Sequence, residues 1–328
     1  MQPFEYANPK TVREAVGLLG KSWEDANVLA GGTDLLSLLK DYIQTPKRVV
    51  SLKGIRDLGG ITKTAAGLRI GAMVTLAELL SSAEVRDEYP SLAQAAHGVS
   101  SPQLRNIGTV GGDLCQRPRC WYFRLGYGLA AKGPNGESLA RSGDNRYHAI
   151  FDNQGPACFV SASSFGPALV ALGAKVKLVS AAGSRELPVE KFFLTPGDEA
   201  GRENALQPGE ILAEILVPPA GGVRNATYEV RQKEALDWPL ATASVALKMK
   251  GKAVESARIV LGHVAPAPHR AVAAEKALVG KTLDAALAEE AGKAAVEGAT
   301  PLASNGYKIQ LARVAVKRAL LEAVKART

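Results

Sequence analysis

Short apolar segments alternate with helical patterns through the N-terminal quarter of this chain. Thr11 and Glu14 have the spacing of a helix capping box, and apolar residues then recur at helical spacing as far as Gly20. Three stretches have the composition of strands: 27–30, 48–52 and 68–72. Strands that alternate with helices at this spacing predict layers of the α/β class.

This pattern changes after the Pro- and Gly-rich stretch 217–222, where we place a domain boundary. The strand patterns beyond it are 228–233, 241–249 and 253–263, the last two forming a hairpin, and the helix patterns are 270–279, 283–297 and 308–326. The sequence therefore predicts an α/β domain over residues 1–222. It predicts an α+β domain, a small antiparallel sheet packed with helices, over residues 223–328. A length of 328 residues fits two domains.

Composition excludes several classes of protein. Hydrophobic residues make up 46% and charged residues 22% of the chain, which excludes intrinsic disorder, coiled coils and collagen. No apolar run approaches the roughly 20 residues of a membrane span, and the first residues do not resemble a signal peptide. A net charge of +8 without a dense basic run argues against nucleic acid as a partner. We expect a cytoplasmic globular protein with no membrane span.

Two glycine loops carry the main chemical signal. Gly31-Gly32-Thr33-Asp34 follows a predicted strand, and Gly108-Thr109-Val110-Gly111-Gly112-Asp113 follows Ile107. Successive backbone N–H groups in such loops can form a nest for a diphosphate, and Thr33 and Thr109 add hydroxyl donors. Neither loop has the Rossmann or P-loop fingerprint. One such loop is more often a turn than a site, but two at predicted α/β junctions favour a dinucleotide held between them.

Together with a third segment, these loops resemble a known family. Segments 29–35 (LAGGTDL), 105–114 (RNIGTVGGDL) and 261–270 (LGHVAPAPHR) look like the FAD-binding medium subunit of bacterial molybdenum hydroxylases, which include xanthine dehydrogenase, aldehyde oxidoreductase and carbon monoxide dehydrogenase. The resemblance implies a two-subdomain FAD-binding fold of the vanillyl-alcohol-oxidase/PCMH-like type, with subdomains of about 1–55 and 56–222. The family's C-terminal flavoprotein domain would follow at 223–328.

The resemblance also implies roles for particular residues. The first loop would bind the FAD diphosphate, the second would wrap the diphosphate, ribityl chain and ring edge, and Ser164 would meet the adenosine part. The expected cofactor-binding residues are Leu29, Ala30, Gly31, Gly32, Thr33, Asp34, Leu35, Ile107, Gly108, Thr109, Gly111, Gly112, Asp113, Leu114, Ser164, Ile211, Leu212 and Trp238. Relatives have Asn where Asp113 stands, so a carboxylate would face the diphosphate there.

Residues near the flavin ring are expected in the segment 228–238. Trp238 stands where relatives place an aromatic side chain over one flavin face, although an ordinary core Trp fits the same pattern. Arg231 and Lys233 would stabilise negative charge on the reduced flavin, or would simply be solvated strand charges. Ile211 and Leu212 resemble an aliphatic pair beside the ring.

The three cysteines fall in an expected insertion of about 115–160. Several relatives hold a [4Fe–4S] cluster there, and Cys115, Cys120 and Cys158 would be its ligands. Such a cluster ordinarily needs four thiolates, and residues 129–141 contain none. We therefore expect reduced thiols and no cluster in this chain.

The resemblance implies an oxidoreductase subunit that acts within a heterotrimer. Electrons would pass from a molybdopterin-binding large subunit, through [2Fe–2S] clusters on a small subunit, to FAD here and on to NAD, a quinone or dioxygen. The basic helix 308–326 offers a surface for a partner, and a partner with an export signal would carry the chain to the periplasm. Two alternatives stay open: a redox-inactive scaffold of the same complex, and a stand-alone FAD oxidoreductase. No catalytic acid–base or nucleophilic arrangement stands out.

Overall fold

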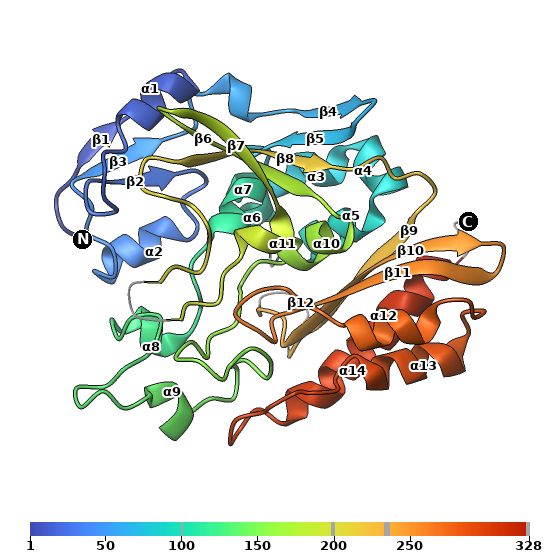
Figure 1. The fold of residues 1–328 in the computed structure, drawn as a ribbon. Helices are drawn as coiled ribbons and strands as arrows, with labels where there is room; N and C mark the ends of the chain where they lie inside the picture. The colour runs from blue at the N-terminus through green and yellow to red at the C-terminus, as the bar shows by residue number, and fades with distance from the viewer. Residues whose placement is uncertain (100, 198–200, 233–236, 326–328) are drawn as a thin grey trace.

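The computed structural model describes residues 1–99, 101–197, 201–232 and 237–325 and contains three β-sheets covered by helices (Figure 1). None of the helices in these ranges is both long enough and apolar enough to cross a membrane.

The first sheet is small and parallel. Its strand order is β1 (Glu5–Ala7), β3 (Arg48–Ser51) and β2 (Ala26–Leu29), connected through α1 (Val12–Gly17) and α2 (Leu35–Lys40). The predicted N-cap at Thr11 is present, since its hydroxyl accepts a hydrogen bond from the Glu14 N–H. The Glu14 carboxylate accepts from the Lys10 N–H, so the reciprocal half of the capping box is displaced by one residue.

The second sheet has five strands, and every pairing in it is antiparallel. The order is β4 (Ile61–Thr64), β5 (Gly67–Gly71), β8 (Ile211–Val217), β6 (Lys175–Ser180) and β7 (Gly183–Pro188). One face is covered by α3 (Leu76–Ser81), α4 (Ala83–Glu88), α5 (Pro90–Gly98), α6 (Pro102–Ile107), α7 (Val110–Cys115), α10 (Phe165–Ala171) and α11 (Val189–Phe192), and the 3₁₀ helix η1 (Arg56–Leu58) precedes β4. Alternation of strands and helices thus predicted the layers, whereas only the first sheet is parallel.

The third sheet and its helices follow the sequence prediction closely. Strands β9 (Arg224–Val230), β10 (Ala241–Lys250), β11 (Ala253–Gly262) and β12 (His269–Arg270) form an antiparallel sheet, with α12 (Val272–Leu278), α13 (Ala285–Ala294) and α14 (Tyr307–Val324) packed on one face (Figure 1). The predicted hairpin is confirmed as β10 and β11. Strand β9 begins at Arg224, four residues earlier than predicted, because Arg224 pairs with Leu247 of β10.

Residues 115–160 run mainly as irregular chain with two short helices, α8 (Trp121–Arg124) and α9 (Leu139–Ser142). The segment nevertheless has apolar cores of its own. Phe123, Leu129, Ala157 and Phe159 are buried together with Leu38 of α2, and Ala131 and Ala140 pack with Cys158. This insertion therefore packs against the N-terminal sheet through α2.

Candidate cofactor site

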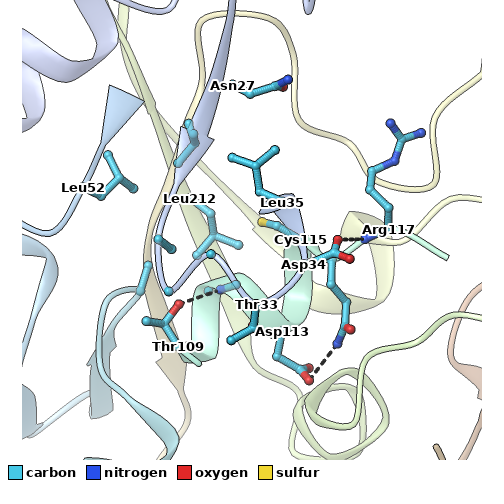
Figure 2. Close-up of a pocket in the computed structure, with 18 of the residues that line it drawn as sticks. Asn27, Thr33, Asp34, Leu35, Leu52, Thr109, Asp113, Cys115, Arg117 and Leu212 are labelled. Atoms are coloured by element: carbon cyan, nitrogen blue, oxygen red, sulfur yellow. Dashed lines mark hydrogen bonds between the residues drawn. The ribbon is translucent and has the colours of Figure 1, made fainter. Parts of the chain in front are cut away.

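A cavity of about 250 Å³ lies where the loop after β2 meets α7 and β8 (Figure 2). Most residues predicted to bind a cofactor line it: Ala30, Gly31, Gly32, Thr33, Asp34, Leu35, Gly108, Thr109, Gly111, Gly112, Asp113, Ile211, Leu212 and Trp238. Segments separated by some 180 residues in the sequence thus contribute to one cavity. Such a concave site with few polar groups is the usual form of a ligand pocket.

The two glycine loops are in direct backbone contact. A Cβ added to Gly31 would lie 2.1 Å from the Ile107 carbonyl oxygen, so no larger residue fits there unless the loops separate. Gly32 has a φ of +86°, which favours glycine. The second loop follows helix α6 rather than a strand, so the expectation of two α/β junctions is met only by the first loop.

Backbone hydrogen bonding distinguishes the loops. The N–H groups of Gly31, Gly32, Thr33 and Asp34 donate no hydrogen bond to any described residue. The N–H groups of the second loop are already used by the protein: the Gly111 N–H donates to the Ala72 carbonyl, and the Gly112 N–H donates to the Thr109 hydroxyl. Unpaired N–H groups in succession favour an anion, so the first loop is the better diphosphate nest.

The Asp34 side chain connects the first loop with the insertion. Its carboxylate accepts from the Arg117 backbone N–H at 2.8 Å (Figure 2). It also pairs with the guanidinium groups of Arg119 at 2.9 Å and Arg124 at 2.7 Å. All three arginines come from the segment 117–124 of the insertion, and none of them is among the residues that the sequence predicts to bind a cofactor. Charge-assisted hydrogen bonds of this kind stabilise the contact and also fix the relative orientation of the two groups.

Two cations of the cavity lining, Arg117 and Arg202, lie near Glu203 and Trp23. Arg117 pairs with the buried carboxylate of Glu203. Arg202 lies over the Trp23 ring at 4.0 Å, and its buried Nε has no hydrogen-bond partner among the described residues. Burial, followed by repulsion from Arg117, lowers the pKa of Arg202 to about 10. A partly buried cation with an unused donor is favourable for an anionic ligand.

Asp113 faces the N-terminus of helix α10 as well as the cavity. Its carboxylate accepts hydrogen bonds from the Ser163 hydroxyl, the Phe165 N–H and, more weakly, the Ser164 N–H at 3.4 Å. Gln116 donates to the same group at 3.0 Å (Figure 2). Burial raises the pKa of Asp113 to about 6 in spite of these donors. The carboxylate is therefore occupied by the protein's own N–H and O–H groups.

Five of the predicted residues do not line the cavity. Leu29 lies beneath Gly32, Ile107 is largely exposed and contributes its carbonyl oxygen to the loop contact, and Leu114 belongs to the central core. Ser164 is buried, and Arg231 pairs with Glu229. Lys233 lies outside the described residues. Trp238 does line the cavity, with 47% of its surface exposed and the Arg119 guanidinium 4.7 Å from its ring centre.

The cysteines lie in separate environments. Cys115 lines the cofactor cavity, and burial raises its pKa to about 12. The Cys120 Sγ lies 3.2 Å from His148 Nε2, and Cys158 is buried beside the Asn153 carbonyl. The described residues include no group of three or more His, Cys, Asp or Glu side chains placed to hold a metal ion.

Several cavity residues were not identified from the sequence. Trp23, Asn27, Arg117, Arg119 and Arg202 all line the site. Arg117 and Arg119 flank Pro118 between two cysteines, and that local run of cations beside a predicted diphosphate loop was a usable signal. No local sequence pattern indicates Arg202, because its position in the cavity depends on packing between distant segments.

Two protein families match nearly the whole chain. Residues 2–220 match the FAD binding domain in molybdopterin dehydrogenase, and residues 226–323 match the CO dehydrogenase flavoprotein C-terminal domain. The carbon monoxide dehydrogenase medium chain of Hydrogenophaga pseudoflava is 32% identical over 97% of this chain and 96% of its own length. The aldehyde oxidoreductase FAD-binding subunit PaoB of Escherichia coli K12 is 31% identical over 98% and 99%.

The fold has solved counterparts as well. The carbon monoxide dehydrogenase from Hydrogenophaga pseudoflava that lacks the Mo-pyranopterin moiety of the molybdenum cofactor contains a chain that superposes with a TM-score of 0.75, at 32% identity, over 98% of both chains.

Proposed function

This chain belongs to the FAD-binding subunits of the molybdenum hydroxylase family, and on that premise we propose that it carries electrons from a molybdenum-containing partner to an external acceptor. FAD, when bound, would supply the redox chemistry by taking up and releasing electrons. The chain's own residues would bind the cofactor, orient it and control its surroundings.

The unpaired N–H groups of the first glycine loop are the observation that carries this proposal. The backbone from Gly31 to Asp34 offers four N–H donors that have no partner in the described part of the chain, and the added-Cβ contact at Gly31 shows that the close approach of the loops requires glycine. The Arg202 guanidinium adds a partly buried positive charge to the same cavity. These donors fit a diphosphate group, so the residues present suit FAD.

The flavin ring is assigned to the end of the cavity that Trp238 lines. The indole would cover one ring face, with the buried side chains of Ile211 and Leu212 as apolar neighbours. Arg231 and Lys233 remain candidates for stabilising a reduced ring, and Ser164 for the adenosine part.

The proposal that this chain has partner subunits rests on the names of its relatives rather than on features of the chain itself. The relatives are named as medium chains or FAD-binding subunits, and the solved counterpart is described by its molybdenum cofactor. We propose that a molybdopterin-binding large subunit and a [2Fe–2S] small subunit assemble with this chain, and that NAD, a quinone or dioxygen takes the electrons. The medium subunit would itself carry no iron–sulfur cluster. We propose a cytoplasmic location.

The decisive experiment titrates the flavin-free chain with FAD and, in parallel, with riboflavin, which lacks the diphosphate. We expect saturable quenching of tryptophan fluorescence by FAD and at least a hundredfold weaker effect from riboflavin. Equal binding of the two flavins would contradict the diphosphate assignment. A chain that binds neither would be a scaffold.

Metal analysis of proteins that copurify with the tagged chain tests the partners. We expect molybdenum and iron, and flavin without either metal would indicate a stand-alone oxidoreductase.

A further inference from the structure

A second cavity, of about 260 Å³, adjoins the cofactor cavity. Its walls are mostly aromatic and aliphatic, and they include the side chains of Trp121, Phe159, Val160, Trp238 and Leu240. Gly-rich loops of the kind that bind phosphate are absent from the described part of its lining. The cavity is therefore suited to a compact ligand that is largely apolar.

Trp238 and Arg119 line both cavities, and they are the only described residues that do so. Because the Arg119 guanidinium lies 4.7 Å from the Trp238 ring centre, these two side chains pack on each other as one partition. A group in the second cavity would thus be separated from the proposed flavin position by about one side chain. That separation is short enough to make the second cavity relevant to electron transfer.

Two buried histidines border this second cavity with an unused ring nitrogen each. His263, which is 1% exposed, uses Nδ1 for the Thr242 hydroxyl at 3.0 Å, and its buried Nε2 has no hydrogen-bond partner among the described residues. His148, which is 2% exposed, uses Nε2 for Cys120, and its Nδ1 is likewise without a partner within the described chain. A buried polar atom without a partner is unfavourable unless a ligand or water satisfies it.

Lys308, the one lysine in the described lining of this cavity, offers no donor to a ligand. The Lys308 ammonium donates to the carbonyl oxygens of Tyr147, His148 and His263, and three carbonyls use all three of its N–H groups. Arg119 pairs with Asp34 and donates to the side-chain oxygen of Gln116, although its buried Nε has no partner among the described residues. The cavity therefore has little to offer a diphosphate, which argues against a dinucleotide as its occupant.

We infer that the second cavity binds the ring of a quinone, the electron acceptor of the proposed function on which this inference rests. The flat ring would lie among the aromatic and aliphatic walls, and an oxo oxygen would accept a hydrogen bond from Nε2–H of His263, with Thr242 donating to Nδ1. Reduction of a quinone to its hydroquinone takes two electrons and two protons. Oxidation of the neutral two-electron-reduced flavin releases two electrons and two protons, and oxidation of its anion releases two electrons and one proton, with the second proton then taken from water.

The test uses duroquinone, whose ring is fully methylated and so has no carbon open to addition by the Cys120 thiol. Calorimetric titration of the oxidised, FAD-loaded chain is expected to show saturable binding. The variants Val160→Phe and Leu240→Phe fill the second cavity without touching the cofactor cavity, and each is expected to weaken duroquinone binding at least tenfold. Val272→Phe, on the exposed face of α12, is the matched control and is expected to bind as the wild type does.

Flavin absorbance of each variant reports FAD loading, and circular dichroism reports folding, separately from quinone binding. Absence of saturable duroquinone binding, or unchanged affinity in both filled variants, would overturn the inference. Binding of NAD⁺ that both filled variants abolish would overturn it too. If the chain takes up no FAD, the proposed function fails, yet the duroquinone titration of the flavin-free chain still decides whether the second cavity is a quinone site.

Discussion

The Asp34 carboxylate lies 2.7 Å from the Arg124 guanidinium and thereby joins the first glycine loop to helix α8 of the insertion. Asp34 precedes helix α2 but makes no side-chain hydrogen bond to the N–H groups of that helix. Its oxygens face Arg124, Arg119 and the Arg117 N–H instead. The insertion neutralises the Asp34 carboxylate, so the backbone N–H groups of the first glycine loop remain available for a ligand.

The Asp34→Asn variant removes that neutralising charge from Arg119 and Arg124, whose side chains are mostly buried. Leaving buried cations without their partner is costly, and we expect the free energy of unfolding to fall by about 3 kcal/mol. FAD affinity should fall as well, because the loop loses its anchor. Urea denaturation and FAD titration measure the two effects. Asp41→Asn, at the exposed end of the same helix α2, is the control; an equal effect of both variants would contradict the anchoring role.

Replacement of Gly31 by Ala tests the contact between the loops. A Cβ 2.1 Å from the Ile107 carbonyl oxygen forces the two loops apart, so we expect the dissociation constant for FAD to rise at least tenfold. Gly17→Ala provides the comparison, because that glycine lies in helix α1 with no atom within 4 Å of an added Cβ. Unchanged FAD binding by Gly31→Ala would show that the close approach is dispensable.

How much the sequence could predict depended on the range of the interactions involved. The glycine loops and the β10–β11 hairpin follow from residues close together in the chain, and both were identified. The antiparallel central sheet was not, because strand β5 pairs with β8 through Leu68 and Val217, about 150 residues apart. Periodicity reports which segments are strands but carries no information about such distant partners.

The same reason explains the residues of the site that were missed. Arg202 reaches the cavity because its neighbour Glu203 pairs with Arg117, a contact between segments 86 residues apart. Asp113 shows a different limit. Its identity alone suggested a carboxylate facing the diphosphate, whereas its oxygens accept from Ser163 and Phe165, which no local pattern indicates.

Arg202→Gln is expected to weaken FAD binding about tenfold, because a charge-assisted hydrogen bond contributes about 1.5–3 kcal/mol. The stability of the flavin-free chain should not fall, since burial already lowers the pKa of Arg202 and disfavours its charge. FAD titration at low and high salt checks the electrostatic origin, with a smaller salt dependence expected for the variant. Arg13→Gln is the matched control, because it also removes one positive charge but at an exposed position of α1. A variant with wild-type affinity would exclude Arg202 from the anion site.

Asp113 should make stability depend on pH in a direction opposite to that of a salt-bridged carboxylate. Burial raises its pKa to about 6 from an ordinary 3.8, so the folded state binds a proton that the unfolded chain has released between these values. The contribution of Asp113 is thus fully present below pH 3.8 and is lost as the pH rises through 6. Between pH 4.5 and 7.5 the loss amounts to about 2 kcal/mol, since each pKa unit corresponds to about 1.4 kcal/mol.

The Asp113→Asn variant isolates this contribution, because its amide stays neutral throughout. The unfolding free energy of the wild type relative to this variant should be about 2 kcal/mol more favourable at pH 4.5 than at pH 7.5, measured by denaturant titration at both values. Asp57→Asn, at an exposed position, is the matched control. A wild type that instead gains stability over Asp113→Asn as the pH rises would mean that the donors around Asp113 outweigh its burial and hold it ionised.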